Sequence, residues 1–355
     1  MSQSERFLQA CRSQQTDCTP VWLMRQAGRY MEEYRKLREQ YPIMTLCKTP
    51  ELAARVTLQP VQRFNLDAAI IFADILLPLE PLGLKLEFAK GEGPVIHNPI
   101  RTTKDVELLR PVLPEESLNF VLEAIRIVRR ELNGKIPLIG FAGAPFTMAS
   151  YMIEGSSSRN YLHAKSFMYN NSSAWHKLMN RLALTIRDYL LAQVCFGAQV
   201  IQLFDSWAGI LSPSDYREYV MPHSRLILES VAKSGVPVIH FGTDTLGLLP
   251  YFKEAGGDII GIDWRVDINN TRKILGDNVV IQGNLDPAVL MAPLPIIKRN
   301  VERILLEAGM RVEPPGKAPR GFIFNLGHGI LQETPVNNVE ALINMVHELS
   351  SGDPM

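Results

Sequence analysis

Short apolar runs alternate with longer amphipathic segments along most of the chain. The short runs span four or five residues, as is typical of strands buried on both faces. The longer segments carry apolar residues every three or four positions, the period of a helix with one buried face. The predicted strands are residues 21–24, 68–72, 137–141, 200–204, 236–240, 259–263, 279–283 and 322–325. The predicted helices are residues 51–64, 117–132, 174–196, 214–233, 245–255, 295–308 and 334–349.

This alternation predicts parallel strands joined by right-handed helical crossovers. An open doubly wound sheet and a closed (β/α)8 TIM barrel both meet that description. Eight predicted strands favour the barrel, and 355 residues suit one barrel with insertions. We find no repeat, low-complexity tract or linker, and therefore predict a single domain over residues 1–355. The glycines and prolines of residues 76–135 predict an irregular insertion within it.

The amino-acid composition limits the kinds of binding partner that we expect. The formal net charge is zero, so bulk charge does not indicate a nucleic-acid partner, although a local basic site for an anion remains possible. The four cysteines form no C-x-x-C pair, and no histidine lies two residues from one, which indicates thiols in a reducing compartment. The N-terminus has no apolar signal core, and no apolar run reaches 18 residues. We therefore expect a cytoplasmic protein without a membrane span.

Polar or glycine-rich residues follow each apolar run at once. In a barrel, the turns after the strands all lie on the C-terminal rim, where active sites occur. In an open sheet they would line an edge instead. The turns in question begin at Arg25, Asp74, Gly143, Asp205, Gly242, Trp264, Asn284 and Leu326.

Two arginines follow the first predicted strand. Arg25 and Arg29 flank Gly28, which allows backbone to approach a ligand closely. The planar guanidinium binds carboxylates through two parallel hydrogen bonds. The alternative is a solvated helix start with surface ion pairs. Their place after a buried strand favours the carboxylate site.

Asp74 ends one of the most apolar runs of the chain, residues 69–73. A carboxylate in such a place must be paired or must accept hydrogen bonds. It is either a helix cap or the partner of a core arginine, or else an acceptor for the N–H groups of a ligand.

Four further side chains stand in the predicted strand-end turns or close after them. Ser206 and Thr243 are most simply interpreted as caps of the helices that follow. Tyr151 is either a core residue with its hydroxyl at the surface or a ligand contact. His328 lies between Gly327 and Gly329 and has the most exposed setting of the seven histidines. We interpret the other six as structural.

Five segments resemble the signature motifs of the uroporphyrinogen decarboxylases. They are residues 20–30 (PVWLMRQAGRY), 69–76 (AIIFADIL), 140–147 (GFAGAPFT) followed by 151–155 (YMIEG), 203–209 (LFDSWAG) and 325–329 (NLGHG). Five long motifs in the same order make a chance match very improbable.

The resemblance implies a homodimeric (β/α)8 barrel that has no metal and no organic cofactor. Its members convert uroporphyrinogen III to coproporphyrinogen III in haem biosynthesis by removing the carboxyl groups of the acetate side chains. It implies that Asp74 accepts hydrogen bonds from the pyrrole N–H groups, and that Asp74, Arg29 and Tyr151 are catalytic. The implied substrate contacts are Arg25, Gln26, Ala27, Gly28, Arg29, Arg38, Asp74, Tyr151, Phe204, Ser206 and His328.

Two other functions fit parts of the pattern. A zinc or cobalamin-type barrel methyltransferase would need thiolate and histidine ligands, yet Cys195 lies in an apolar stretch with no histidine nearby in sequence. A non-catalytic carrier of anionic tetrapyrroles would keep Arg25 and Arg29 but would not need Asp74. The decarboxylase accounts for all of these residues.

Overall fold

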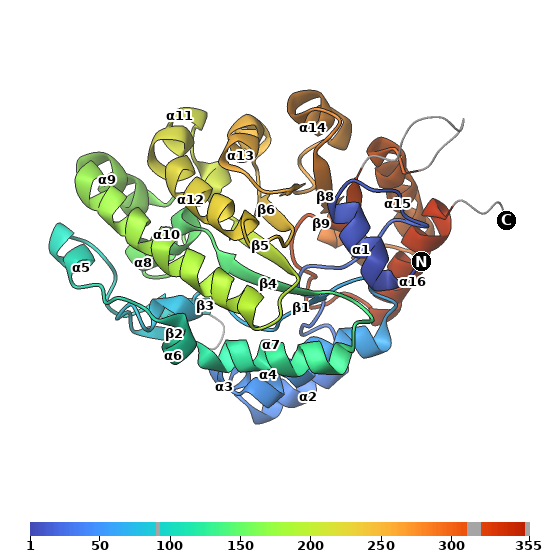
Figure 1. Cartoon of the computed structure of the whole chain (residues 1–355), viewed down its shortest axis with the longest axis horizontal. Coiled ribbons are helices and arrows are strands. Elements are labelled where there is room, and N and C mark those ends of the chain that lie inside the picture. The colour runs from blue at the N-terminus through green and yellow to red at the C-terminus, as the bar shows by residue number, and fades with distance from the viewer. Residues whose placement is uncertain (90–92, 311–320, 352–355) are drawn as a thin grey trace.

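Seven parallel strands form the centre of the molecule in a computed structural model, which describes residues 1–89, 93–310 and 321–351 (Figure 1). Their order in the sheet is β1-β4-β5-β6-β7-β8-β9, so each strand lies beside the next one along the chain. Their bounds are β1 Ala69–Ile70, β4 Leu138–Gly143, β5 Val200–Asp205, β6 Val238–Gly242, β7 Ile259–Gly261, β8 Val280–Leu285 and β9 Phe322–Leu326. Seven of the eight predicted strands are therefore confirmed.

The eighth predicted segment, residues 21–24, closes the sheet without forming a regular strand. Val21 makes a single parallel bridge to Phe324 in β9. On its other side, the Asp67 N–H donates to the Val21 carbonyl at 2.9 Å, just before β1. The Asp67 carboxylate accepts in turn from the Val21 N–H at 2.8 Å. The two ends of the sheet thus meet through this segment, which confirms the barrel and excludes the open sheet.

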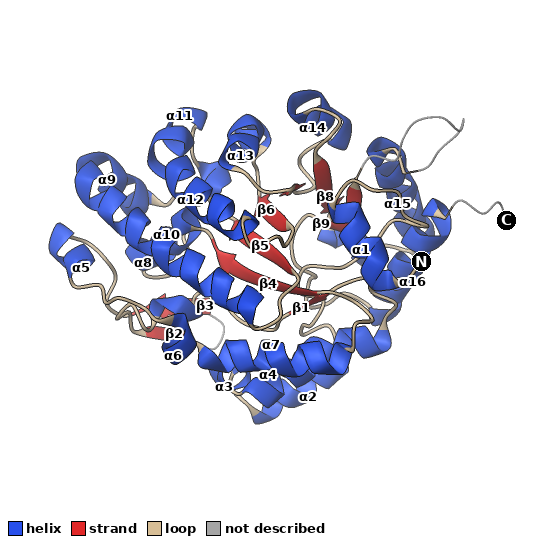
Figure 2. Cartoon of the chain, viewed as in Figure 1, coloured by secondary structure: helices blue, strands red, loops and turns tan. Residues whose placement is uncertain are grey.

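Helices surround the strands (Figure 2). The predicted helices appear as α4 Pro50–Arg63, α7 Asn119–Leu132, α10 Ser172–Cys195, α12 Met221–Ala232, α13 Leu249–Ala255, α15 Leu294–Ala308 and α16 Val336–Ser350. One predicted helix, 214–233, is broken: a short α11 (Pro213–Asp215) and a π-helical turn (Tyr216–Val220) precede α12. Pro222 at the start of α12 has no N–H to donate, which accounts for the change in winding.

Several short elements were not predicted. They are α1 Gln3–Cys11, α2 Glu32–Gln40, α3 Ile43–Lys48, α5 Thr103–Glu107, α6 Pro114–Ser117, α8 Pro145–Glu154, α9 Leu162–Asn170, α14 Ile268–Leu275 and four 3-10 turns. The predicted irregular insertion contains an antiparallel hairpin of β2 (Leu86–Ala89) and β3 (Gly93–Ile96). These elements have 3 to 10 residues, so their apolar period extends over at most about three turns.

Polar side chains are buried inside the barrel and are paired with one another. The Trp22 indole donates to Gln282 at 2.9 Å, and Gln282 donates to Gln202 at 3.0 Å. All three side chains are almost fully buried. The chain of hydrogen bonds satisfies them and links β5, β8 and the closing segment beneath the rim.

Candidate active site

The C-terminal rim carries the side chains that the sequence singled out. Asp74 follows β1, Tyr151 lies on α8 after β4, Ser206 follows β5, and His328 follows β9. Arg25 follows the closing segment at the same end, since Ile330, just beyond β9, donates its N–H to the Met24 carbonyl at 3.0 Å. The parallel sheet therefore brings these five residues to one mouth.

Asp74 is partly exposed at this mouth and keeps one oxygen unengaged. Its Oδ1 accepts the Leu76 N–H at 2.8 Å, in a local turn before the 3-10 helix Leu77–Leu79. It caps no helix and makes no ion pair with any described residue. Loss of hydration raises its pKa, while the Leu76 N–H and the charge of Arg25 act in the opposite direction. The carboxylate is thus available to N–H donors from a ligand.

Arg25 adopts a backbone conformation that is costly for a side chain of its size. Its φ is +60°, in the left-handed region. A Cβ on Gly329 would collide with the stem of Arg25, so the stem lies directly against the turn after β9. Among the described residues its guanidinium has neither a hydrogen-bond acceptor nor an ion-pair partner. The strained backbone and the unpaired guanidinium make Arg25 a candidate for ligand binding.

His328 is held neutral at the same turn. Burial lowers its pKa to about 4, and the nearby charges of Arg25 and Arg265 act in the same direction. At neutral pH the imidazole has one donor and one acceptor nitrogen. It can therefore hydrogen-bond a ligand without adding charge between two arginines.

Tyr151 faces an aromatic cluster on the neighbouring loop. Its ring lies 6.2 Å from that of Trp207, which also contacts Tyr161 at 5.8 Å. Burial raises the pKa of Tyr151, the charge of Asp74 raises it further, and a hydrogen bond from Trp207 opposes the change. The phenol is therefore protonated at neutral pH and close enough to Asp74 to be affected by its charge.

Three phenylalanines line the ends of neighbouring strands. Phe204 contacts Phe141 edge-on at 5.5 Å and Phe241 at 5.7 Å. Phe204 and Phe141 remain partly exposed. An apolar floor of this kind, rimmed by a few polar groups, is typical of a site for a flat organic ligand.

Gln26 is buried, and both ends of its amide are already used. Its oxygen accepts the Leu23 N–H at 3.1 Å, and its nitrogen donates to the Ala68 carbonyl at 3.1 Å. The side chain therefore holds the arginine loop to the start of β1. Its predicted contact with substrate is not available to the side chain in this arrangement.

The other two predicted arginines lie in different settings. Arg29 is exposed and donates to Gln332 at 3.2 Å, beside the partly exposed Ala27 and Gly28. Arg38 lies on α2, where it donates to the Tyr41 carbonyl at 2.6 Å. Its Nε is buried without a partner among the described residues. Arg29 is thus open to solvent, whereas Arg38 is anchored through one nitrogen.

Ser206 and Thr243 do not cap helices, so this interpretation was wrong. The Thr243 hydroxyl donates to the Ser206 carbonyl at 2.6 Å, which ties the turn after β5 to the turn after β6. The cap that follows Ser206 is Ser212, whose hydroxyl accepts the Asp215 N–H at 3.1 Å. The Ser206 hydroxyl itself stays partly exposed and is free of this bond.

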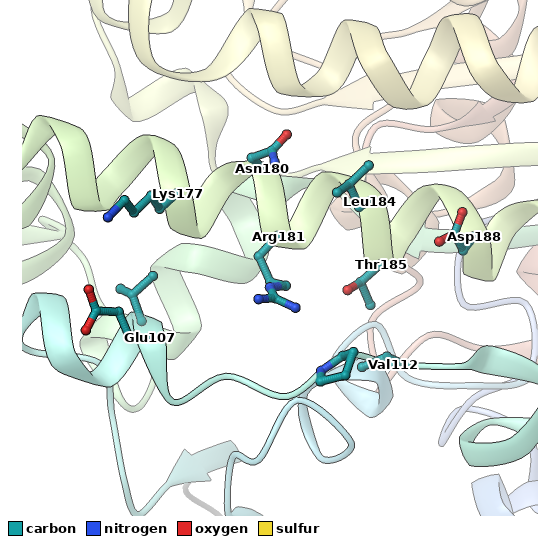
Figure 3. A pocket seen from close by; sticks show the side chains of 10 residues that line it. Glu107, Val112, Lys177, Asn180, Arg181, Leu184, Thr185 and Asp188 are labelled. Carbon is teal, nitrogen blue, oxygen red and sulfur yellow. The ribbon is translucent and has the colours of Figure 1, made fainter.

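A separate cavity of about 630 Å³ lies between α10 and residues 106–112 (Figure 3). Lys177 and Arg181 line it, but so do Glu107 and Asp188, so its charges balance. None of the predicted site residues reaches it. This cavity is therefore separate from the predicted site residues.

Comparison with known proteins decides between the possible functions of such a barrel. The family model described as Uroporphyrinogen decarboxylase (URO-D) matches residues 2–349. The chain belongs to the uroporphyrinogen decarboxylase family. The uroporphyrinogen decarboxylase of Carboxydothermus hydrogenoformans is 53% identical over 348 residues, which cover 98% of this chain and 97% of the relative. That of Thermus thermophilus is 51% identical over 348 residues, which cover 98% and 99%.

Solved structures support the fold. A methyltransferase from Methanosarcina mazei aligns with a TM-score of 0.82 and 20% identity, covering 98% of this chain and 99% of its own. A B12-independent methionine synthase from Shewanella aligns with a TM-score of 0.54 and 11% identity, covering 95% of each chain. At these identities the likeness concerns architecture alone. It does not favour the methyltransferase alternative over the family match.

Sequence reasoning missed one charged residue at the rim and most of the aromatic groups. Arg265 directly follows Trp264, where one of the predicted strand-end turns begins, but it was not proposed for the site. Phe141, Phe241 and Trp207 also were not proposed, because apolar rings in strands and turns are most often core. Position at a strand end is the signal that could have identified them.

Proposed function

We propose that this chain removes the acetate carboxyl groups of uroporphyrinogen III, with Asp74 beneath the pyrrole N–H groups and the rim arginines on the side-chain carboxylates. The observation that carries the proposal is the unengaged oxygen of Asp74 at a mouth that also holds the unpaired Arg25. Family membership supports the carboxy-lyase activity, and the geometry supports these roles.

The chemistry needs a place for an electron pair. Protonation of the substrate's pyrrole ring at carbon makes the ring cationic, and the bond to the carboxylate carbon can then break. The electron pair flows into the ring and carbon dioxide leaves. A second proton, added to the resulting methylene carbon, completes the methyl group, and the first proton leaves the ring carbon so that the pyrrole is restored. An ionised Asp74 stabilises the cationic ring. By analogy with other charge-stabilising groups, it lowers the activation free energy by about 3 kcal/mol. The substrate itself supplies the electron sink that a bound cofactor supplies elsewhere.

The arginines orient the substrate. Arg25 and Arg29 hold propionates and remaining acetates by charge-assisted hydrogen bonds. Arginine is a poor proton donor because its pKa is so high. Tyr151, protonated and within the influence of Asp74, is the better placed group for proton transfer. Neutral His328 forms a hydrogen bond with a carboxylate or with the edge of a pyrrole ring, and it adds no charge of its own to the site.

The non-catalytic carrier differs from this proposal in one observable respect. A carrier binds the tetrapyrrole and returns it unchanged, whereas the enzyme releases carbon dioxide. Anaerobic incubation with uroporphyrinogen III, followed by mass analysis of the carboxyl groups lost, separates the two. Full conversion to coproporphyrinogen III supports the proposal, and unchanged substrate contradicts it.

Two features outside the site complete the proposal. All four cysteines are free, and three of them are buried, which fits a reducing cytoplasm. Among the described helices, none has the length and apolar character needed to cross a membrane. We also infer a homodimer, in line with the family resemblance; light scattering of the purified chain tests it.

A further inference from the structure

We infer that Arg265 is an additional carboxylate-binding residue of this site and so helps to determine its specificity for a polyanionic substrate. This inference rests on the proposed function. Arg265 follows β7, next to the turn after β9. It was not among the residues that the sequence motifs assigned to the substrate.

The position of Arg265 is fixed by a buried acid. Asp263 is fully buried. Its carboxylate accepts hydrogen bonds from the Arg265 guanidinium, from the backbone N–H of Arg265 at 3.3 Å and from the backbone N–H of Asp244 at 3.0 Å. The Arg265 guanidinium also lies 4.2 Å from the ring of Trp264. Acid and ring together hold the guanidinium in place before any ligand binds, which reduces the entropy lost on binding.

The guanidinium of Arg265 still has N–H donors that Asp263 does not engage. Only its Nη1 is engaged by Asp263, and the side chain is 49% exposed. A guanidinium carries five N–H groups, so several remain for a carboxylate. A purely structural partner of Asp263 would not need to leave half of its surface open at the rim.

Close packing places Arg265 beside the other residues of the mouth. A Cβ on Gly327 would lie 2.5 Å from the Trp264 nitrogen, so the turn after β9 rests directly on the Trp264–Arg265 loop. The other end of that turn, Gly329, rests on Arg25. Arg25 and Arg265 therefore flank His328, and the charge of each helps to keep it neutral. Two guanidiniums on either side of one neutral imidazole form a surface for more than one carboxylate.

The test compares Arg265→Gln and Arg265→Lys with Arg130→Gln as control. Arg130 is 74% exposed at the end of α7, on the rim opposite the mouth. We expect Arg265→Gln to raise KM for uroporphyrinogen III about tenfold, with kcat within about twofold, as follows from losing one charge-assisted hydrogen bond. Arg265→Lys keeps the charge beside Asp263 and loses the fork, so its KM should lie between wild type and Arg265→Gln.

Titration with uroporphyrin III, the oxidised octacarboxylate, gives a second readout by fluorescence that needs no turnover. Its Kd should rise about tenfold in Arg265→Gln and stay unchanged in Arg130→Gln. If both Arg265 variants match the control in Kd and KM while remaining folded, the inference is wrong. Failure of the proposed function looks different, because wild type itself would then bind the porphyrin without releasing carbon dioxide from uroporphyrinogen III.

Discussion

Asp74 and its neighbours have conformations and environments that oppose folding. The raised pKa of Asp74 means that ionising this carboxyl costs more free energy in the folded protein than in the unfolded chain, so the ionised form lowers stability near neutral pH. Arg25 has a φ of +60°, and Tyr161 and Asp244, also near the mouth, have φ values of +50° and +57°. Such costs are maintained where function requires them.

Arg25→Gly separates strain from function. Glycine adopts a positive φ without cost, a gain of about 1 kcal/mol that is offset by the greater freedom of the unfolded chain. We expect the free energy of unfolding to change by less than about 1 kcal/mol, while KM for uroporphyrinogen III rises about tenfold or more. Denaturant unfolding and steady-state kinetics measure the two effects. Unchanged KM would show that the guanidinium does not hold the substrate.

His328→Gln should reduce the loss of stability in acid. The pKa of His328 is lowered from 6.5 to about 4 by folding, so the unfolded chain binds a proton in this window that the folded chain does not. Stability from this group is therefore present above pH 6.5 and lost as the pH falls towards 4. Between pH 7 and pH 5, measured by denaturant unfolding, the variant should lose about 2 kcal/mol less than wild type. His223, whose pKa is also lowered to about 4, remains in both proteins as an internal reference.

At the scale of elements, the strand-end turns contact one another closely at glycines, in addition to the side-chain hydrogen bonds of Thr243 and Asp263. The turn after β9 packs against the turn after β7 at Gly327, and the turn after β5 packs against that after β6 at Gly209. Each contact leaves no room for a Cβ beside the neighbouring backbone. The rim is thus a continuous layer of backbone in which one displaced turn shifts the next.

Gly327→Ala tests this coupling, with Gly247→Ala as its control. The new Cβ would lie 2.5 Å from the Trp264 nitrogen, which cannot move alone. At Gly247 the nearest atom is 3.9 Å away. We expect Gly327→Ala to cost about 2 kcal/mol or more of stability and to lower kcat/KM, while the control changes neither by much. Equal behaviour of the two variants in thermal unfolding and kinetics would argue against a packed rim.

The elements also show what the sequence could predict. Seven strands and most long helices follow from period and length, because each buries enough apolar surface to leave a clear pattern. The segment at residues 21–24 was predicted as a strand, but it makes only one bridge and turns at once into the strained Arg25. For Gln26, position indicated the site but could not show that its amide bonds to Leu23 and Ala68. Thr243 likewise followed the cap pattern, although its hydroxyl joins two turns.

At the scale of the whole molecule, closure of the sheet is what converts separate turns into one site. Asp74 stands near the start of the described barrel and His328 near its end, yet residues 20–22 lie between β9 and the chain just before β1 and join the two ends of the sheet. The protein has no formal net charge, so the affinity for a polyanion arises from local placement of arginines. Binding should therefore weaken with salt through these few contacts.

Treatment with a chelator tests whether the reaction needs a metal ion. We expect activity to survive prolonged incubation with a strong chelator, because the substrate ring acts as its own electron sink. The measurement is the rate of carbon dioxide release before and after dialysis against the chelator. Loss of activity that a single divalent metal restores would contradict this account.

The most direct test of the central claim is the turnover of Asp74→Asn with uroporphyrinogen III under anaerobic conditions. Asparagine keeps the shape of the side chain and removes the charge that we propose lies against the pyrrole nitrogens. The account predicts that kcat falls about a hundredfold or more. It also predicts a higher free energy of unfolding, since the ionised Asp74 costs stability at neutral pH. A folded variant that releases carbon dioxide at close to the normal rate would contradict the role given to Asp74.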